Sequence, residues 1–318
     1  MRPVILDCDP GHDDALAILL AAPHLRLLGI TTVAGNQSIE KVTANALKVV
    51  ELAGLARIPV AQGMARPLVR QPVHAGEIHG DSGLDGPDLP APSTPLHPRH
   101  AVDFIIDTVM STDGVTLIPT APLTNVAAAL RREPRLAKRI PEISLMGGSM
   151  TCGNSTPAAE FNIYCDPEAA HVVFTSGIPI KMCGLNLTRQ ANATEVEVER
   201  IRRLGNRTGR AVAEMLDFYR GRLRQMFGLA GGPLHDPCAV AALIDPSLIE
   251  FRPMHVAVEL TGTHTCGMTV CDSRHLARGQ VEGGGGVRRG ETPNAEVGVR
   301  LDVEQFFNLL IETLGRYP

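Results

Sequence analysis

The sequence lacks the features that mark several classes of protein. Its N-terminus has only a short apolar run, residues 4–6, before charged residues follow. We therefore expect neither a signal peptide nor a membrane span there, and a cytoplasmic protein with no membrane partner. It also has no run of basic residues, and 30 basic against 34 acidic residues give a net charge of −4. This balance argues against nucleic acid as a partner.

Cysteine is too irregularly placed for a disulfide framework. The chain has seven cysteines, an odd number, and no Cys-x-x-Cys pair. Reduced and mostly buried thiols are the expected state. A hydrophobic content of 44% with 20% charged residues indicates a globular protein with a substantial core, which excludes disordered and collagen-like chains.

Apolar runs rich in β-branched residues alternate with helical patterns along the chain. The predicted strands are residues 4–6, 28–33, 115–119, 143–146, 178–182 and 255–260. The predicted helices are residues 14–21, 39–53, 101–110, 123–131, 167–175, 196–203, 209–227 and 237–243. This alternation predicts an α/β fold with an open, mostly parallel, Rossmann-like sheet covered by helices on both faces. We find no convincing linker and interpret residues 1–318 as one domain.

Polar clusters follow four of the predicted strands. They are residues 7–14, Asn36, residues 120–125 and the segment from Gly147 onward. Ligands bind beyond the carboxyl ends of strands in such sheets, so these clusters predict one shared site. Residues 74–98 and 279–293, rich in glycine and proline, are expected to be flexible surface loops.

Four aspartates lie within eight residues, at the end of a strand and the start of a helix: Asp7, Asp9, Asp13 and Asp14. Carboxylates packed so closely repel one another unless a cation neutralises them. Carboxylates, which offer only oxygen ligands, favour a hard cation such as Ca²⁺ or Mg²⁺ over zinc. The alternative is a first-turn acidic pair preceded by two turn-forming aspartates. His12 lies inside the cluster without an assigned role.

Residues 7–14, DCDPGHDD, closely resemble the signature of the inosine-uridine preferring nucleoside hydrolase family. Further segments resemble the family in the same order: residues 33–36, 79–86, 121–125, 146–148, 160–164, 166–170, 235–237 and 294–298. The resemblance covers nearly the whole chain. It implies a nucleoside hydrolase fold and an enzyme that splits ribonucleosides into ribose and free base. A departure lies at residues 279–291, where arginines and four consecutive glycines replace a shorter family segment.

The resemblance implies a calcium site. Its ligands would be the side chains of Asp9, Asp14 and Asp236 and the main-chain carbonyl of Thr124, with Asp7 as a supporting residue beside them. A water bound to the cation and hydrogen-bonded to Asp9 would lose its proton more easily. Asp9 would then act as general base as well as ligand.

Cleavage of an N-glycosidic bond builds positive charge on the ribose, which nearby oxygens must stabilise. The resemblance gives this role, together with binding of the ribose hydroxyls, to five residues: Asp13, Asn36, Asn154, Glu160 and Asn162. From the sequence alone, Asn36 and Asn154 could equally be turn asparagines beside glycines. Met146 would pack near the ribose, although filling the core is an equal alternative.

The departing base benefits from a proton, and the resemblance assigns this step to His235, assisted by His79. A lone histidine is more often structural, but His235 adjoins the expected ligand Asp236. Tyr219 would contact the base or, alternatively, belong to a helix core. Tryptophan, which stacks on the base in the purine-specific branch of the family, is absent from the chain. This absence argues against a strictly purine-specific enzyme and favours pyrimidine or broad preference, as in cleavage of uridine and inosine.

Two other functions fit parts of the pattern. Asp7-x-Asp9 after a strand also suits a haloacid dehalogenase-like phosphatase, but only Lys181 could serve as its lysine, and residues 160–162 and 235–237 would be unexplained. A non-catalytic nucleoside-binding protein on the same fold would need neither Asp9 as base nor His235 as acid. The resemblance further implies nucleoside salvage and a homotetramer or homodimer.

Overall fold

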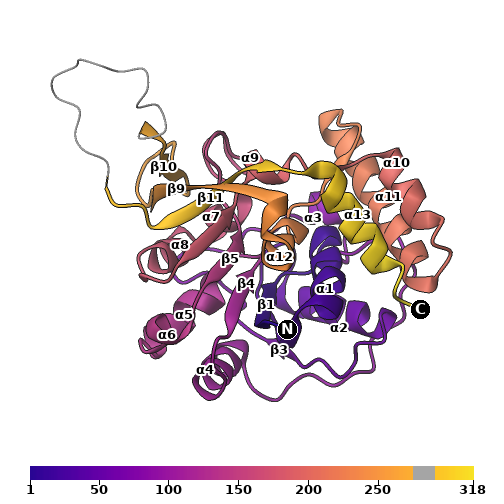
Figure 1. Ribbon diagram of the computed structural model, residues 1–318, viewed down its shortest axis with the longest axis horizontal. Coiled ribbons are helices and arrows are strands. Elements are labelled where there is room, and N and C mark those ends of the chain that lie inside the picture. Colours follow the sequence, from indigo (N-terminus) through magenta and orange to yellow (C-terminus); the bar gives the residue numbers. More distant parts are fainter. Residues whose placement is uncertain (275–290) are drawn as a thin grey trace.

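The computed structural model describes residues 1–274 and 291–318 and is built on a nine-stranded sheet (Figure 1). Its strand order is β10-β9-β11-β6-β5-β4-β1-β2-β3, and β7 and β8 form a separate pair. The strands are β1 (Pro3–Cys8), β2 (Arg26–Thr32), β3 (Val60–Gln62), β4 (Thr116–Pro119), β5 (Ile143–Met146), β6 (Ile180–Cys183), β7 (Asn192–Ala193), β8 (Gly232–Pro233), β9 (Ile249–Val258), β10 (Thr269–Asp272) and β11 (Ala295–Leu301).

The pairing confirms the predicted open, mostly parallel sheet. Strands from β3 through β6 are parallel to their neighbours, and β11 continues this pattern beside β6. Strand β9 runs antiparallel to both β11 and β10. The chain moves outward from β1 to β2 and β3, then returns to place β4 on the other side of β1. A crevice therefore opens beyond the carboxyl ends of β1 and β4, where the strand order reverses.

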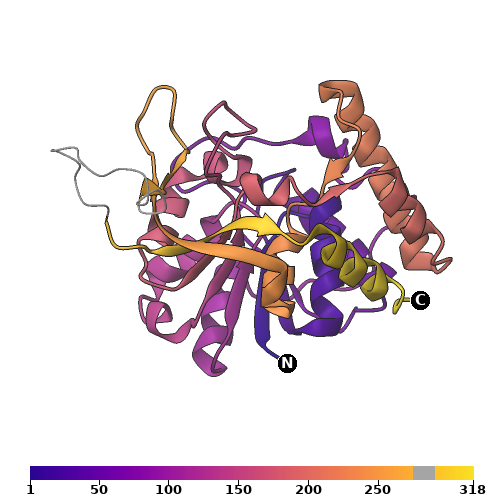
Figure 2. The ribbon, with the colours of Figure 1, turned by 45° about the horizontal axis from the view of Figure 1, so that its top comes forward.

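Helices cover both faces of the sheet, as Figures 1 and 2 show. They are α1 (His12–His24), α2 (Ile39–Leu52), α3 (Gly76–His79), α4 (Ala101–Ser111), α5 (Thr124–Arg132), α6 (Leu136–Arg139), α7 (Phe161–Cys165), α8 (Pro167–Phe174), α9 (Leu185–Thr188), α10 (Glu195–Arg202), α11 (Arg207–Phe227), α12 (Pro237–Ile244) and α13 (Val303–Leu314), with the 3-10 helix η1 (Pro246–Leu248).

Two apolar cores lie on opposite faces of the sheet because successive strand side chains point in opposite directions. In β1, Val4 and Leu6 contribute to the core beneath α1, α2, α12 and α13. Ile5, between them, contributes to the core beneath α4, α5 and α8. Burial on both faces explains why the central strands are continuous apolar runs rather than alternating ones.

The start of α1 carries the acidic motif to the end of β1. Gly11 is its N-cap, and its backbone N–H donates to Asp14 Oδ2 at 3.1 Å. An acidic side chain at this position is favourable because the first helical N–H groups carry partial positive charge. A Cβ on Gly11 would lie 2.6 Å from His79 Nδ1, so the turn requires glycine.

The sequence predicted the central strands and eight helices but missed the edges of the sheet. Strand β9 begins at Ile249, six residues before the predicted start at His255, because Arg252 and Pro253 interrupt its apolar pattern. Strands β3, β10 and β11 and helix α13 were not predicted. Segment 74–98, expected to be a flexible loop, contains the helical turn α3. Most of the second expected loop, 279–293, lies outside the described residues.

The structure also bears on the state of the cysteines and on membrane-spanning helices. All seven cysteines are free thiols, as expected, and four of them are buried. Among the described helices, none combines the length and the apolar character that a bilayer crossing demands.

Candidate active site

A cavity of about 650 Å³ lies beyond the carboxyl ends of the central strands. Polar side chains that follow β1, β2 and β4 or lie at the starts of α1, α7 and α12 form one part of its wall, which we call the deep end: Asp9, Asp13, Asn36, Thr120, Glu160, Asn162 and Asp236. Apolar side chains at the end of α11 and just after it form another part, which we call the outer end: Leu223, Phe227 and Leu229. His79, Met146, Asn154, Tyr219 and His235 also line it. The predicted shared site at the strand ends is therefore a single cavity.

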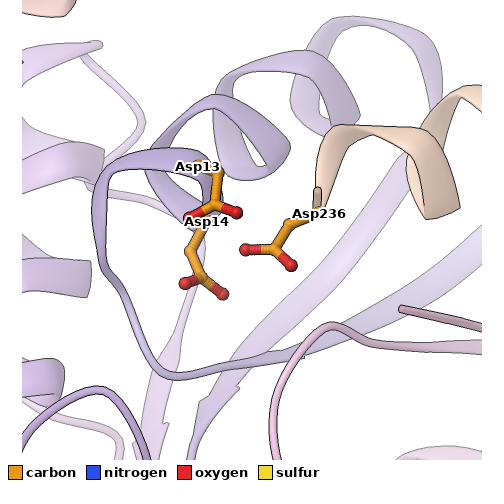
Figure 3. A group of neighbouring side chains, drawn as sticks. All are labelled: Asp13, Asp14 and Asp236. Carbon is orange, nitrogen blue, oxygen red and sulfur yellow. The ribbon is translucent and has the colours of Figure 1, made fainter. Parts of the chain in front are cut away.

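Three aspartates at the deep end converge. Asp13 and Asp14 come from the first turn of α1, and Asp236 comes from the residue before α12 (Figure 3). Carboxylate oxygens from the three side chains lie within 4.8 Å of one another. Asp14 and Asp236, two of the ligands that the resemblance implies, lie together in this cluster, but its third member is Asp13 and not the implied ligand Asp9.

Burial and mutual repulsion disfavour the charged form of these carboxyl groups. Burial, then the charge of Asp14, raises the pKa of Asp13 to about 6. Burial also raises the pKa of Asp14 to about 6, against hydrogen bonds that favour its charged form. Burial and neighbouring carboxylates also raise the pKa values of Asp9 and Asp236. A bound cation would offset the repulsion between these carboxylates and favour their ionised form.

Asp9 is held by the loop after β2. The backbone N–H of Asn36 donates to Asp9 Oδ2 at 2.6 Å, and its side-chain amide donates to Asp9 O at 3.1 Å and to Asp14 Oδ2 at 3.3 Å. Thr120, at the end of β4, donates to Asp14 Oδ1 at 2.9 Å. These donors fix the orientation of both carboxylates, so Asn36 is more than a turn residue.

Asp7 and Thr124 lie in the buried layer beside the cluster. Asp7 Oδ1 accepts hydrogen bonds from Thr31 and Asn125, whereas its Oδ2 has no partner within the described residues. Burial raises the pKa of Asp7 to about 6. The Thr124 hydroxyl donates to Asp166 Oδ2 at 2.7 Å, which fixes the first residue of α5. The predicted role of the Thr124 carbonyl as a metal ligand remains a prediction.

The donor set at the deep end fits a hard cation. All side chains of the cluster offer carboxylate oxygens, and neither cysteine nor histidine belongs to it. Oxygen-only sites of this kind suit Ca²⁺ or Mg²⁺.

Asn162 and Glu160 have fixed orientations at the start of α7. The Asn162 amide nitrogen donates to the carbonyls of Thr120 and Met146, at 2.9 and 3.1 Å, and none of the described residues donates to its Oδ1. Glu160 caps α7 by accepting from the backbone N–H groups of Gly148, Asn162 and Ile163. Burial nevertheless raises the pKa of Glu160 to about 7.

Two further predicted residues border the cavity in different ways. Asn154 is exposed, and its Oδ1 accepts from Phe161 N at 2.9 Å, so its amide N–H groups remain available as donors. Met146 is 3% exposed and belongs to an apolar core cluster as well as to the cavity wall. Met146 therefore fills the core as one interpretation expected, and its packing near the ribose stays a prediction.

His235 lies between the acidic cluster and helix α9. Its backbone N–H donates to Asp13 Oδ2 at 3.3 Å, and its Nδ1 lies 2.7 Å from the hydroxyl oxygen of Thr188. Burial lowers the pKa of His235, although the charge of Asp13 opposes this effect. The imidazole is thus bonded on one side and lines the cavity.

His12, unassigned from the sequence, lies behind His79. Their Nδ1 atoms are 3.0 Å apart, and His12 Nε2 is 2.8 Å from the carbonyl oxygen of Asp85. The Tyr219 ring is stacked on the His79 ring with centroids 5.7 Å apart, and its hydroxyl donates to Pro233 O. Burial lowers the pKa values of both histidines, that of His12 to about 4. His12 therefore supports His79, while Tyr219 packs against a histidine and also lines the cavity.

Other residues of the cavity wall had not been predicted from the sequence. Thr120 belonged to a recognised polar cluster but had no assigned role. Arg189 and Asn192 follow helix α9, which is one turn long and had not been predicted. Arg189 donates to Gly153 O at 3.1 Å and to Cys152 Sγ at 3.0 Å. Neither residue belongs to a motif, so no sequence pattern identified them.

Comparisons with known proteins agree with this geometry. The sequence pattern of the family described as "Inosine-uridine preferring nucleoside hydrolase" matches residues 4–308. The chain is 45% identical over 320 residues to the pyrimidine-specific ribonucleoside hydrolase RihA of Photobacterium profundum, covering 99% of both chains. It is 43% identical over 319 residues to the pyrimidine-specific ribonucleoside hydrolase RihB of Escherichia coli, covering 99% of this chain and 98% of the other.

Solved structures give the same result. A purine-preferring ribonucleoside hydrolase from Gardnerella vaginalis superposes with a TM-score of 0.89 at 34% identity, covering 99% of this chain and 98% of the other. A plant nucleoside hydrolase superposes with the same TM-score at 33% identity and covers 99% of both chains. The strand-end cavity, its oxygen-rich cluster and these full-length similarities establish that the chain belongs to the inosine-uridine preferring nucleoside hydrolase family and is a hydrolase of N-glycosyl compounds.

Proposed function

We propose that this enzyme hydrolyses pyrimidine ribonucleosides to ribose and free base, with a calcium ion held by Asp9, Asp14, Asp236 and the Thr124 carbonyl. The observation that carries the proposal is that Asp9 and His235 line one cavity. Hydrolysis of this bond needs a base for the water and an acid for the leaving group. A protein that merely binds nucleosides needs neither, and a phosphatase would leave His235 without a role.

Asp9 is the general base of the proposed mechanism. The Asn36 backbone N–H occupies Asp9 Oδ2, so Oδ1 keeps its lone pairs for the attacking water. A calcium ion in the site would supply positive charge that keeps the surrounding carboxylates ionised and lowers the pKa of a nearby water. Asp9 then takes the proton of that water as it attacks the anomeric carbon.

The deep end binds and stabilises the ribose. Positive charge develops on the sugar ring as the bond to the base lengthens, and fixed oxygens oppose that charge without having to reorganise. Asn162 Oδ1 is such an oxygen, because its amide nitrogen is bonded to two carbonyls. Asp13, Asn36, Asn154 and Glu160 bind the ribose hydroxyls in this proposal.

His235 protonates the departing base, and His79, which also lines the cavity, assists it. The electron pair of the broken bond moves onto the base, and a proton from His235 neutralises it. Tyr219 keeps His79 in place by stacking on its ring.

The preference for pyrimidines rests on two observations. The relatives at 43% and 45% identity are named pyrimidine-specific, whereas the solved structure at 34% identity is named purine-preferring. The chain also contains no tryptophan, so stacking on the base falls to smaller rings such as Phe227. We therefore expect uridine and cytidine to be better substrates than inosine and adenosine.

Release of reducing sugar from uridine, cytidine, inosine and adenosine tests this proposal. Faster cleavage of both pyrimidine nucleosides supports it. Faster cleavage of inosine would refute the base preference and leave the hydrolase activity intact. Failure to cleave any of the four by folded, metal-loaded protein would refute the proposed substrate class.

The proposal also includes the domain organisation, the metabolic role and the oligomeric state. We propose that residues 1–318 act as one domain, because both apolar cores pack on the same sheet. The role in nucleoside salvage and the homo-oligomeric state are what the family resemblance implies. Light scattering of the eluted protein distinguishes a monomer from a dimer or tetramer.

A further inference from the structure

Helix α9 places a buried hydroxyl against the proposed acid. Thr188, its last residue, is 0% exposed, and its Oγ1 lies 2.7 Å from His235 Nδ1. Among the described residues, this hydroxyl has His235 as its one hydrogen-bond partner. The contact joins segments 47 residues apart in the sequence.

We propose that Thr188 is a positioning residue that fixes the ring of His235 so that a protonated Nε2 meets the departing base. This inference rests on the proposed role of His235. Which nitrogen of an imidazole carries the proton is set by the hydrogen bond that the other nitrogen makes. In this proposal the Thr188 hydroxyl donates to Nδ1 of the neutral ring, which places the proton of neutral His235 on Nε2.

A hydroxyl suits this position because it can both donate and accept. When His235 carries a second proton, Thr188 Oγ1 accepts from Nδ1–H and the ring keeps its orientation. As the bond between the anomeric carbon and the base breaks, its electron pair goes to the base and the Nε2 proton follows. The ring is then neutral and still donates Nδ1–H to Thr188. The second proton returns from water after the base leaves.

The backbone around His235 is held independently of Thr188. Leu234 N donates to the carbonyl of Ala191 at 2.8 Å, β7 pairs with β8, and His235 N donates to Asp13. Removing the Thr188 hydroxyl should therefore release the ring and leave the segment in place. The expected effect falls on proton donation rather than on folding or ribose binding.

The chain offers a matched control. Thr313, in α13, is also 0% exposed, and its Oγ1 lies 2.8 Å from His24 Nε2. There the hydroxyl has a second partner, the carbonyl of Leu309, at 2.7 Å. Thr313→Val thus removes a buried threonine–histidine contact at residues that do not line the cavity. It measures how much the loss of such a contact changes kcat without acting on His235.

The test compares two substrates in Thr188→Val, Thr188→Ser, Thr313→Val and His235→Ala. Uridine needs a proton on its leaving base, whereas the p-nitrophenolate of p-nitrophenyl riboside leaves without one. A positioned acid contributes about 10²–10⁴-fold to the rate of such a reaction. We therefore expect Thr188→Val to lower kcat for uridine by about tenfold or more. The kcat for p-nitrophenyl riboside should change by less than about threefold. Thr188→Ser should restore uridine cleavage, and Thr313→Val should change neither.

The outcomes separate this inference from the function on which it rests. Equal loss on both substrates in Thr188→Val, or no loss on either, overturns the role of Thr188. If His235→Ala spares uridine cleavage, the proposed acid itself is wrong. Nitrogen NMR shifts of the His235 ring give a readout apart from activity. A single Nε2–H form in the wild type and a mixture in Thr188→Val support the inference, and the same spectrum in both overturns it.

Discussion

The deep and outer ends of the cavity are built in different ways. At the deep end, Asp9, Asn36 and Asn162 follow strands or begin helices, are at most 8% exposed and are bonded to neighbouring segments. At the outer end, Leu223 is 5% exposed, whereas Phe227, which ends α11, and Leu229, just after it, are 58% and 44% exposed. Bond-breaking chemistry needs fixed groups, whereas the identity of the base can be selected by side chains at a surface. Substitutions at the deep end should therefore lower the rate of bond cleavage, whereas substitutions at the outer end should change the preference between bases.

Asp9→Asn should have the largest effect. The substitution keeps the acceptor for the Asn36 N–H but removes the basic oxygen, so we expect kcat for uridine to fall about 10²–10⁴-fold. Steady-state kinetics with uridine and p-nitrophenyl riboside measure it, and both substrates should lose equally because both need an activated water. A variant that keeps most of its turnover would support a base other than Asp9.

Calcium binding should weaken as the pH falls. Burial raises the pKa of Asp13 and Asp14 to about 6 from an ordinary 3.8, so the metal-free folded chain holds protons that the unfolded chain releases. Their contribution to metal-free stability is present at low pH and is lost as the pH rises through about 6. Calcium must displace those protons, so it should stabilise the protein more at pH 7 than at pH 5.

Melting temperatures measured with calcium and with chelator at each pH give this comparison directly. Taking the difference between the two cancels protonation elsewhere in the chain. A calcium-induced rise in melting temperature that is equal at pH 5 and pH 7 would show that the cluster does not lose protons on binding.

Asn162→Ala should have an intermediate effect. Losing one fixed group that stabilises developing charge typically costs about 10²–10³-fold in kcat, and part of this remains when a water fills the gap. We expect uridine and p-nitrophenyl riboside to be affected equally, because Asn162 acts on the sugar. A selective loss with uridine would place Asn162 at the base instead.

Phe227→Ala should have the smallest effect and a different pattern. One aromatic contact is worth about 0.5–1.5 kcal/mol, which corresponds to a few-fold change in kcat/KM. The ratio of uridine to inosine cleavage should shift. Met226→Ala is the matched control, because Met226 is 39% exposed and is not among the cavity-lining residues described. Equal effects of the two variants would remove Phe227 from base selection.

The deep end could be predicted from the sequence because its residues follow strands. A carboxylate after β1, an asparagine after β2 and a cluster after β4 must meet at one sheet edge once the strands are parallel. Asp236 could be added only through the family resemblance, because nothing in the local pattern indicates that the start of α12 lies beside α1. Its position depends on the packing of α1 against α12 in the shared core.

The contacts that support the histidines could not be predicted. His12 and His79 are 67 residues apart, and Thr188 and His235 are 47 apart, so each pair forms only when the chain folds. Helices α3 and α9, which carry His79 and Thr188, have four residues each and no amphipathic period. Strand β10, with four residues at the edge of the sheet, is too short for a clear pattern. Strand β11 pairs with β9 and β6, which lie far from it in the sequence.

The central claim is that the buried carboxylates hold a calcium ion on which cleavage of the nucleoside depends. Titrating calcium into chelator-treated enzyme, while recording both bound calcium and ribose release from uridine, tests it most directly. We predict that activity is absent without calcium and returns in proportion to one ion bound per chain. Undiminished cleavage of uridine by metal-free enzyme would contradict the account.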